Sequence, residues 1–265
     1  MPTEQDTMDK PWLERGWLLL IYIFASVFLG WLLAILVGQK VFLPIITALL
    51  IYPIFANRVM QGRLGAAAGW TLVWALAMTV VGILFTILWP RLFIGEWAGR
   101  LDAAVERGGE YTKSMFVWIA TGVGAESDPT RFIPVHLRNL GMFSLASLLS
   151  GGALGLAFGA VQLNLMNFYV GMFTSYSHQP VLAVFLAWPP YSIMRVVGYI
   201  VLATGLSTPA ICWATKKCVP WKKASRFFLA GLALVLLDIL VKWLVAPLWR
   251  ELLIGLAPSF AGGIS

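Results

Sequence analysis

Charged residues fall into short breaks along this chain, and long uncharged apolar runs lie between the breaks. Because a hydrocarbon core about 30 Å thick needs roughly 20 residues of helix, runs of this length predict membrane crossings. The predicted spans are residues 16–37, 41–56 and 66–89, two segments within 140–176, and residues 191–213 and 227–248. The pattern therefore predicts an all-α fold, a polytopic transmembrane helix bundle of about seven spans.

Two of these runs leave the span count open. Residues 41–56 are a short run that contains Pro44 and Pro53, so this segment either crosses tilted beside its neighbours or re-enters the bilayer. Residues 140–176 are nearly twice as long as one crossing needs, and we interpret them as two antiparallel spans that turn near Gly159 to Gln162. A single long crossing there would reduce the count to six.

A pair of prolines interrupts the apolar stretch that follows. Pro189 and Pro190 cannot continue a helix that reaches them, because proline lacks the backbone N–H and restricts the residue before it. We therefore expect Val181 to Trp188 to be a short piece on the membrane surface, and Tyr191 to Trp213 to be the next span.

The longest hydrophilic break is the loop at residues 90–139. From Trp97 to Ile119 apolar residues recur at helical spacing, which predicts an amphipathic helix lying on the membrane. Its other face carries a stripe of carboxylates at Asp102, Glu106 and Glu110. We expect a solvated face there, with a cationic partner or a divalent ion as the alternative. Residues 126–129 predict a turn and helix cap before a short segment, with calcium binding as the alternative.

The distribution of basic residues predicts the orientation. The loop at residues 215–226 carries five basic residues and no acid: Lys216, Lys217, Lys222, Lys223 and Arg226. Basic loops stay in the cytoplasm, so seven spans place both this loop and the N-terminus inside the cell and the C-terminus outside. The predicted organisation is a cytoplasmic segment at 1–15, a hairpin and third span at 16–89, an extracytoplasmic loop at 90–139, a transmembrane core at 140–248 and an extracytoplasmic tail at 249–265. We expect a bacterial or archaeal cell membrane.

Composition and cysteine usage narrow the function classes. The chain has 60% hydrophobic and 12% charged residues, whereas about a quarter of the residues in soluble proteins are charged. The net charge of +7 does not indicate nucleic-acid binding, because the basic residues adjoin apolar spans and read as orientation signals facing anionic lipid. Cys212 and Cys218 lack other nearby ligands, so we expect free thiols, no metal site and no cofactor.

Glycines recur every four residues at Gly151, Gly155 and Gly159. Small residues at this spacing let two helix backbones approach closely within lipid, so the motif predicts a tight helix contact. We expect a contact inside the chain, with a contact between two copies as the alternative. Three amides follow at Gln162, Asn164 and Asn167, and they either bridge helices or line a polar path.

Three charges remain inside the predicted spans: Arg195, Asp238 and Lys242. A central charge disfavours insertion by about 2.5–3.5 kcal/mol, so these residues should be paired or face a wet cavity. Asp238 precedes Lys242 by four residues, the favourable order for a pair within one helix. Arg195 with Asp238 is the competing pair. A structural ion pair is the simpler interpretation, and a substrate or proton site is the alternative.

Residues 136–249 resemble the integral membrane family of stage II sporulation protein M. The resemblance lies in Leu137-Arg138-Asn139-Leu140 ahead of the Gly-rich helix, the Asn-containing helix at 164–171, the turn at Pro189-Pro190-Tyr191, the basic loop, and a last helix that ends near Pro247. Arg195 and Lys242 stand where the family usually has Glu, and Asn167-Phe168 replaces its Asn-Gly pair. The resemblance implies a scaffold without catalysis that recruits or positions other proteins, such as cell-wall hydrolases or ABC exporters.

The residues themselves agree with a scaffold because catalytic motifs are missing. The two histidines, His136 and His178, belong to no H-E-x-x-H motif, and neither a G-x-S-x-G nor a Walker motif occurs. The first hypothesis is therefore a membrane scaffold or assembly protein with protein and lipid partners. The alternative is a small transporter or lipid translocator in which Arg195, Asp238 and Lys242, with Asn164 and Asn167, bind an anionic substrate.

Overall fold

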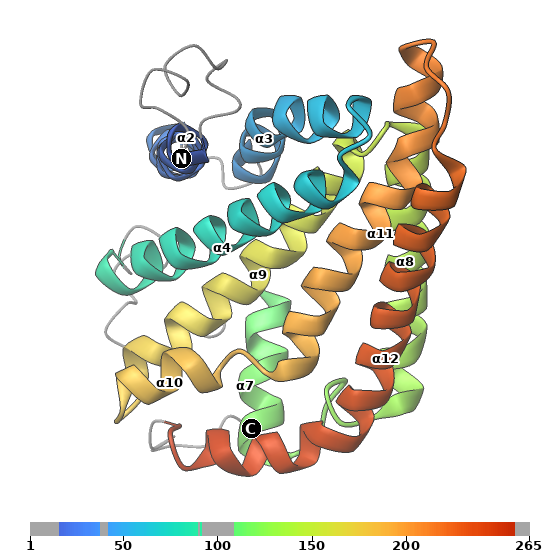
Figure 1. Cartoon of the computed structure of the whole chain (residues 1–265). Coiled ribbons are helices and arrows are strands. Elements are labelled where there is room, and N and C mark those ends of the chain that lie inside the picture. Colours follow the sequence, from blue (N-terminus) through green and yellow to red (C-terminus); the bar gives the residue numbers. More distant parts are fainter. Residues whose placement is uncertain (1–15, 38–41, 90, 92–108, 258–265) are drawn as a thin grey trace, which may run out of the picture.

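The computed structural model describes residues 16–37, 42–89, 91 and 109–257, and this part of the chain is helical without a strand (Figure 1). Its helices are α2 Gly16–Val37, α3 Phe42–Met60, α4 Leu64–Leu88, α7 Glu110–Thr121, α8 Pro129–Leu149, α9 Ala153–Tyr176, α10 Pro180–Leu186, α11 Pro190–Ala214 and α12 Trp221–Ile254. Six of them are long and apolar enough to cross a membrane: α2, α4, α8, α9, α11 and α12. The predicted all-α, multi-pass architecture is confirmed.

Residues 140–176 belong to two helices, as predicted, but the predicted turn and the predicted start of the first helix are wrong. The chain turns at residues 150–152, between α8 and α9, and Gly159 to Gln162 lie within α9. Gly151 and Gly152 both have positive φ, 59° and 97°, which glycine adopts without the steric penalty of a side chain. A single long crossing is therefore wrong. The first helix of the pair begins at Pro129, so the predicted loop boundary at residue 139 falls inside α8.

Helix α3, Phe42–Met60, has 19 residues and contains Pro53. Figure 1 shows α2 end-on and α4 along its length, so these two helices cross at an angle. Gly16 lies near Trp70 early in both helices, and Trp31 stacks on Phe85 late in both. Because the starts of α2 and α4 lie together and their late turns also lie together, α3 returns the chain to the end where α4 begins.

Helix α7 corrects the expected amphipathic surface helix. Residues 92–108 lie outside the described part, and so do Asp102 and Glu106, whereas Glu110 begins α7 and is exposed. The apolar side chains of α7 are buried against aromatic residues of α9, and Phe116 packs edge-on against Tyr169. Its apolar face is therefore covered by protein and not by lipid, because α9 offers a complementary aromatic face.

Contacts between distant segments define two ends of the bundle. At one end the Lys217 ammonium donates to the Met60 carbonyl, so the loop after α11 lies beside the turn after α3. At the other end the Trp249 indole donates to the Leu186 carbonyl, and the Ser177 hydroxyl donates to the Leu256 carbonyl. The basic loop and the end of α12 are therefore on opposite ends, as the predicted topology requires.

The proline pair acts as expected. Pro190 is the first residue of α11, where proline suits the helix start, and Pro189 precedes it in an extended conformation. The short piece before it is helix α10. Helix α12 runs well beyond the predicted 227–248 at both ends, because a helix can continue after it leaves an apolar environment.

The glycine motif supplies one internal contact. A Cβ at Gly155 would collide with Ser147 of α8, so this glycine lets α8 and α9 approach closely within the chain. Gly151 belongs to the turn instead, and at Gly159 the nearest atom to an added Cβ is 3.7 Å away, on Phe143.

The backbones of α11 and α12 also approach closely, at glycines outside the predicted Gly151–Gly155–Gly159 motif. A Cβ at Gly205 would lie 2.5 Å from the Phe228 backbone nitrogen, and one at Gly231 would overlap the Leu202 backbone. Gly205 lies against Phe228 of α12, and Gly231 lies against Leu202 of α11, contacts that form only in the folded pair. They hold together the two helices that carry the intramembrane charges.

Candidate functional site: paired charges beside a cavity

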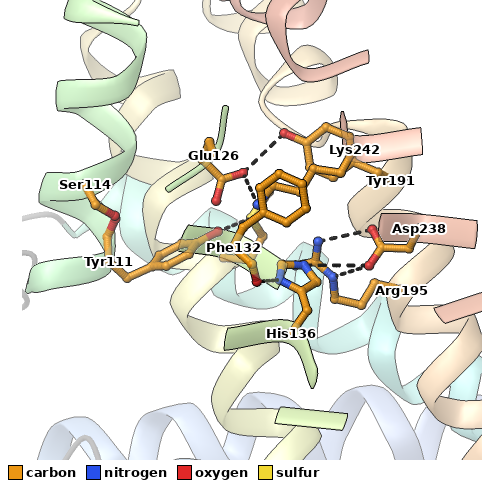
Figure 2. A network of polar contacts seen from close by, with 10 residues as sticks. Tyr111, Ser114, Glu126, Phe132, His136, Tyr191, Arg195, Asp238 and Lys242 are labelled. Atoms are coloured by element: carbon orange, nitrogen blue, oxygen red, sulfur yellow. Dashed lines mark hydrogen bonds and ion pairs between the residues drawn. The ribbon is translucent and has the colours of Figure 1, made fainter. Parts of the chain in front are cut away.

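The three predicted intramembrane charges separate into two ion pairs (Figure 2). Arg195 of α11 donates two hydrogen bonds to Asp238 of α12, from Nε to Oδ2 at 2.7 Å and from Nη2 to Oδ1 at 3.1 Å. The Asp238 side chain is 0% exposed and that of Arg195 is 25% exposed. A bidentate guanidinium–carboxylate pair is the strongest form of side-chain ion pair. Of the two pairings left open by the sequence, the contact between helices is the one formed.

Lys242 pairs with a carboxylate that the sequence analysis did not select. Its ammonium lies 2.9 Å from Oε2 of Glu126, in the connection between α7 and α8, and its side chain is 1% exposed. The ammonium also lies 4.8 Å from the centre of the Phe132 ring, and the Tyr191 hydroxyl donates to the same carboxylate at 3.4 Å. The charges of Arg195, Asp238 and Lys242 sum to +1. A further buried carboxylate is therefore needed to neutralise them.

His136 joins the network from α8. Its Nε2 lies 3.8 Å from Oδ2 of Asp238, and its Nδ1 lies 2.9 Å from the Phe132 carbonyl oxygen. His136 was predicted to lie in the loop at residues 90–139, but it belongs to α8, which turns it toward the buried pair (Figure 2). The network thus draws on α8, α11, α12 and the connection before α8.

The connection that carries Glu126 is fastened at several points. Arg250 near the end of α12 donates from Nε to the carbonyls of Trp118 and Ile119, both at 3.0 Å. A cation at the C-terminus of a helix satisfies its last carbonyls and interacts well with its dipole. Asp128 then caps α8 by accepting the Thr130 backbone N–H, as predicted. Hydrogen bonding to Thr130 lowers the pKa of the Asp128 carboxyl.

Tyr111, in the first turn of α7, is close enough to Glu126 to feel its negative charge. Its hydroxyl donates to Sδ of Met166 in α9 at 3.1 Å. Burial, together with the negative charge of Glu126, raises the pKa of Tyr111. The phenol therefore remains protonated across the physiological range and can donate to Met166.

The three predicted amides do not form one set. Asn167 donates from Nδ2 to the Met78 carbonyl at 3.1 Å, which ties α9 to α4. The amide atoms of Asn164 are buried and have no hydrogen-bond partner among the described residues. Gln162 is exposed and lines a cavity. Bridging of helices therefore holds for Asn167, and of the three amides Gln162 lines the cavity.

A cavity of about 110 Å³ lies beside the charge network, between α8, α9 and α11. Arg195 and His136 belong to its lining, together with the small residues Gly155 and Gly159 of α9. Asp238, Lys242, Asn164 and Asn167 are not among its lining residues. The predicted anion site is therefore divided: Arg195 reaches the cavity, and the other two charges are enclosed by protein.

Comparisons with protein-family models, with curated proteins and with solved structures find no match for this chain. Within the described part, no three or more His, Cys, Asp or Glu residues are arranged to hold a metal ion. Cys212 is buried and Cys218 is exposed, and both are free thiols.

Proposed function

We propose that this chain is a multi-pass membrane scaffold that recruits or positions partner proteins and performs no catalysis of its own. The observation that carries the proposal is the pairing of all three intramembrane charges with groups of the same chain. A charge that serves a substrate has to be accessible, whereas Asp238 and Lys242 are enclosed. The Lys242–Glu126 pair fastens the α7–α8 connection to α12, and the Arg195–Asp238 pair fastens α11 to α12.

In this proposal the fastened connection presents a surface to partners outside the cytoplasm. The basic loop after α11 faces the cytoplasm by the positive-inside rule, and so does the N-terminus. The α7–α8 connection and the end of α12 then lie on the outer face, where Val123 of the connection is 64% exposed. The resemblance to the sporulation protein M family is a second support, because it implies recruitment of other proteins.

The direct test is affinity purification of the full-length protein in mild detergent, with mass spectrometry of the proteins that co-elute. A scaffold retains a reproducible set of partners. The exchange Glu126→Gln should release them by loosening the outer connection, while Glu251→Gln, in an exposed pair, should leave them bound. Absence of any reproducible partner from the wild-type protein would overturn the proposal.

A small transporter or lipid translocator is the second candidate, and the cavity beside Arg195 favours it. Replacing both members of the Arg195–Asp238 pair by neutral residues separates the two ideas. For a scaffold, the double exchange Arg195→Met with Asp238→Leu restores expression and partner binding that either single exchange lowers. For a transporter, the double variant folds and transport of its substrate is still lost.

A further inference from the structure

The cavity between α8, α9 and α11 combines apolar walls with hydrogen-bond donors that are not fully used. Trp74 of α4 and Trp188 before α11 both line it. Each indole N–H is buried and has no hydrogen-bond partner among the described residues. A buried donor without an acceptor is unfavourable, so an acceptor brought by a ligand would be stabilised there.

Arg195 adds donors to the same lining without adding net charge. The guanidinium has five N–H groups, and two of its nitrogens contact Asp238. Because that carboxylate already neutralises it, and Glu126 neutralises Lys242, the network near the cavity is balanced. An anionic ligand would bring an uncompensated charge into this apolar interior, whereas a neutral acceptor would not.

The size of the cavity limits what enters it. About 110 Å³ is somewhat less than the roughly 150 Å³ of an apolar cavity that holds one benzene molecule. A ring or a small head fits, and a whole lipid does not. Gln162 is exposed and lines the cavity, so the remainder of a longer ligand can extend outward past α9.

We propose that this cavity binds a neutral, membrane-soluble molecule through a carbonyl oxygen, with the indole N–H groups of Trp74 and Trp188 and the guanidinium of Arg195 as donors. Two sources share this chemistry, a quinone ring and the acyl ester of an uncharged lipid. The site goes beyond the scaffold function, because it binds a small molecule whether or not a partner protein is present.

The chain offers a matched pair of glycines to test the site. Gly159 lines the cavity and has room for a side chain, while Gly141 of α8 has no atom within 4 Å of an added Cβ and lies outside the lining. Gly159→Leu should fill the cavity, and Gly141→Leu adds the same side chain elsewhere. Trp188→Phe removes one donor and keeps an aromatic ring, which covers the case that Gly159→Leu does not fold.

Equilibrium binding to the full-length protein in detergent would use three labelled probes: a short-chain prenylated benzoquinone, a short-chain diacylglycerol and the matching phosphatidic acid. We expect one of the neutral probes to saturate a single site. Its affinity should fall at least tenfold in Gly159→Leu, several-fold in Trp188→Phe and not at all in Gly141→Leu. Binding of the benzoquinone alone identifies a quinone site, and binding of the diacylglycerol alone identifies an acyl-ester site.

Three results would overturn the proposal. One is that neither neutral probe binds at a saturable site. Another is that phosphatidic acid binds more tightly than diacylglycerol, which would make the site anionic. The third is equal affinity in Gly159→Leu and Gly141→Leu, or in Trp188→Phe and wild type. Loss of protein partners with intact probe binding would contradict the scaffold function alone.

Discussion

The buried charge of Lys242 is neutralised by Glu126, which lies outside its own helix. Removing one member of a buried pair leaves an uncompensated charge, which destabilises by about 3–5 kcal/mol. We expect Glu126→Gln to lower the free energy of unfolding in detergent by that amount, and the double exchange with Lys242→Met to recover most of it.

The control for this prediction is the Arg250–Glu251 pair, whose Glu251 carboxylate is mostly exposed. An exposed pair contributes about 0–1 kcal/mol, so Glu251→Gln should change the free energy of unfolding very little. Equal effects of Glu126→Gln and Glu251→Gln, measured by denaturant unfolding, would show that the Lys242–Glu126 pair is not a buried structural contact.

Asp128 predicts a specific pH dependence. Its hydrogen bonds to Thr130 hold the pKa of the carboxyl below its usual range. A lowered pKa in the folded state means that the charged cap stabilises α8 above the unfolded pKa, and that this stabilisation is lost as the pH falls through the folded pKa. Asparagine also caps helices but does not titrate in this range. On acidification from neutral pH to about 3, the Asp128→Asn variant should therefore lose less stability than the wild-type protein loses.

The measurement is the unfolding midpoint of both proteins as a function of pH. Parallel curves for wild type and Asp128→Asn would exclude this carboxylate as the source of the acid sensitivity. The effect should be modest, because the carboxylate lies at the surface.

Helix packing depends most on Gly231, where α12 meets the backbone of α11. A Cβ there would overlap the Leu202 backbone, which cannot move aside as a flexible side chain would. Overpacking of this kind destabilises by about 1–3 kcal/mol, so we expect Gly231→Ala to lower the free energy of unfolding by that amount. At Gly141 an added Cβ meets no atom within 4 Å, and Gly141→Ala should be neutral or slightly stabilising through helix propensity. A tolerated Gly231→Ala would contradict the close packing of α11 on α12.

The existence of the long helices could be predicted from the sequence, but not all their ends. The uncharged run at residues 16–37 coincides with α2, and the proline pair marks the start of α11. Residues 140–176 carry no charge to mark a turn, so only the positive φ of Gly151 and Gly152 locates it. Hydropathy follows the apolar environment and not the hydrogen-bonded helix, which explains why α12 exceeds its predicted length.

The site could be predicted in part. Arg195, Asp238 and Lys242 were predicted as site residues because a charge in lipid is unfavourable. The Arg195–Asp238 ion pair was one of the two pairings predicted. Glu126 could have been found from charge balance. His136 could not have been found from the sequence. It lies near Asp238 only in the folded chain, and no local sequence pattern predicts a contact between residues so far apart.

At the scale of the whole molecule, the fold separates a basic end from an end that carries the charge network. The Lys217–Met60 contact belongs to the first end, and the Arg250–Trp118 contact belongs to the second. The long helices α4, α8, α9, α11 and α12 connect these ends, with each turn at one end or the other (Figure 1). Their length and apolar character make the two ends the opposite faces of a membrane.

This separation is the central claim, and thiol labelling in intact cells tests it most directly. Cys218 is exposed in the basic loop, and Val123→Cys would place a thiol on the exposed connection after α7, with Cys212→Ala removing the buried thiol. With a membrane-impermeant maleimide, the account predicts that the thiol at position 123 reacts in intact cells and that Cys218 reacts only after permeabilisation. Reaction of both thiols from the same side would contradict a membrane between the two ends, and the reverse order would contradict the proposed orientation.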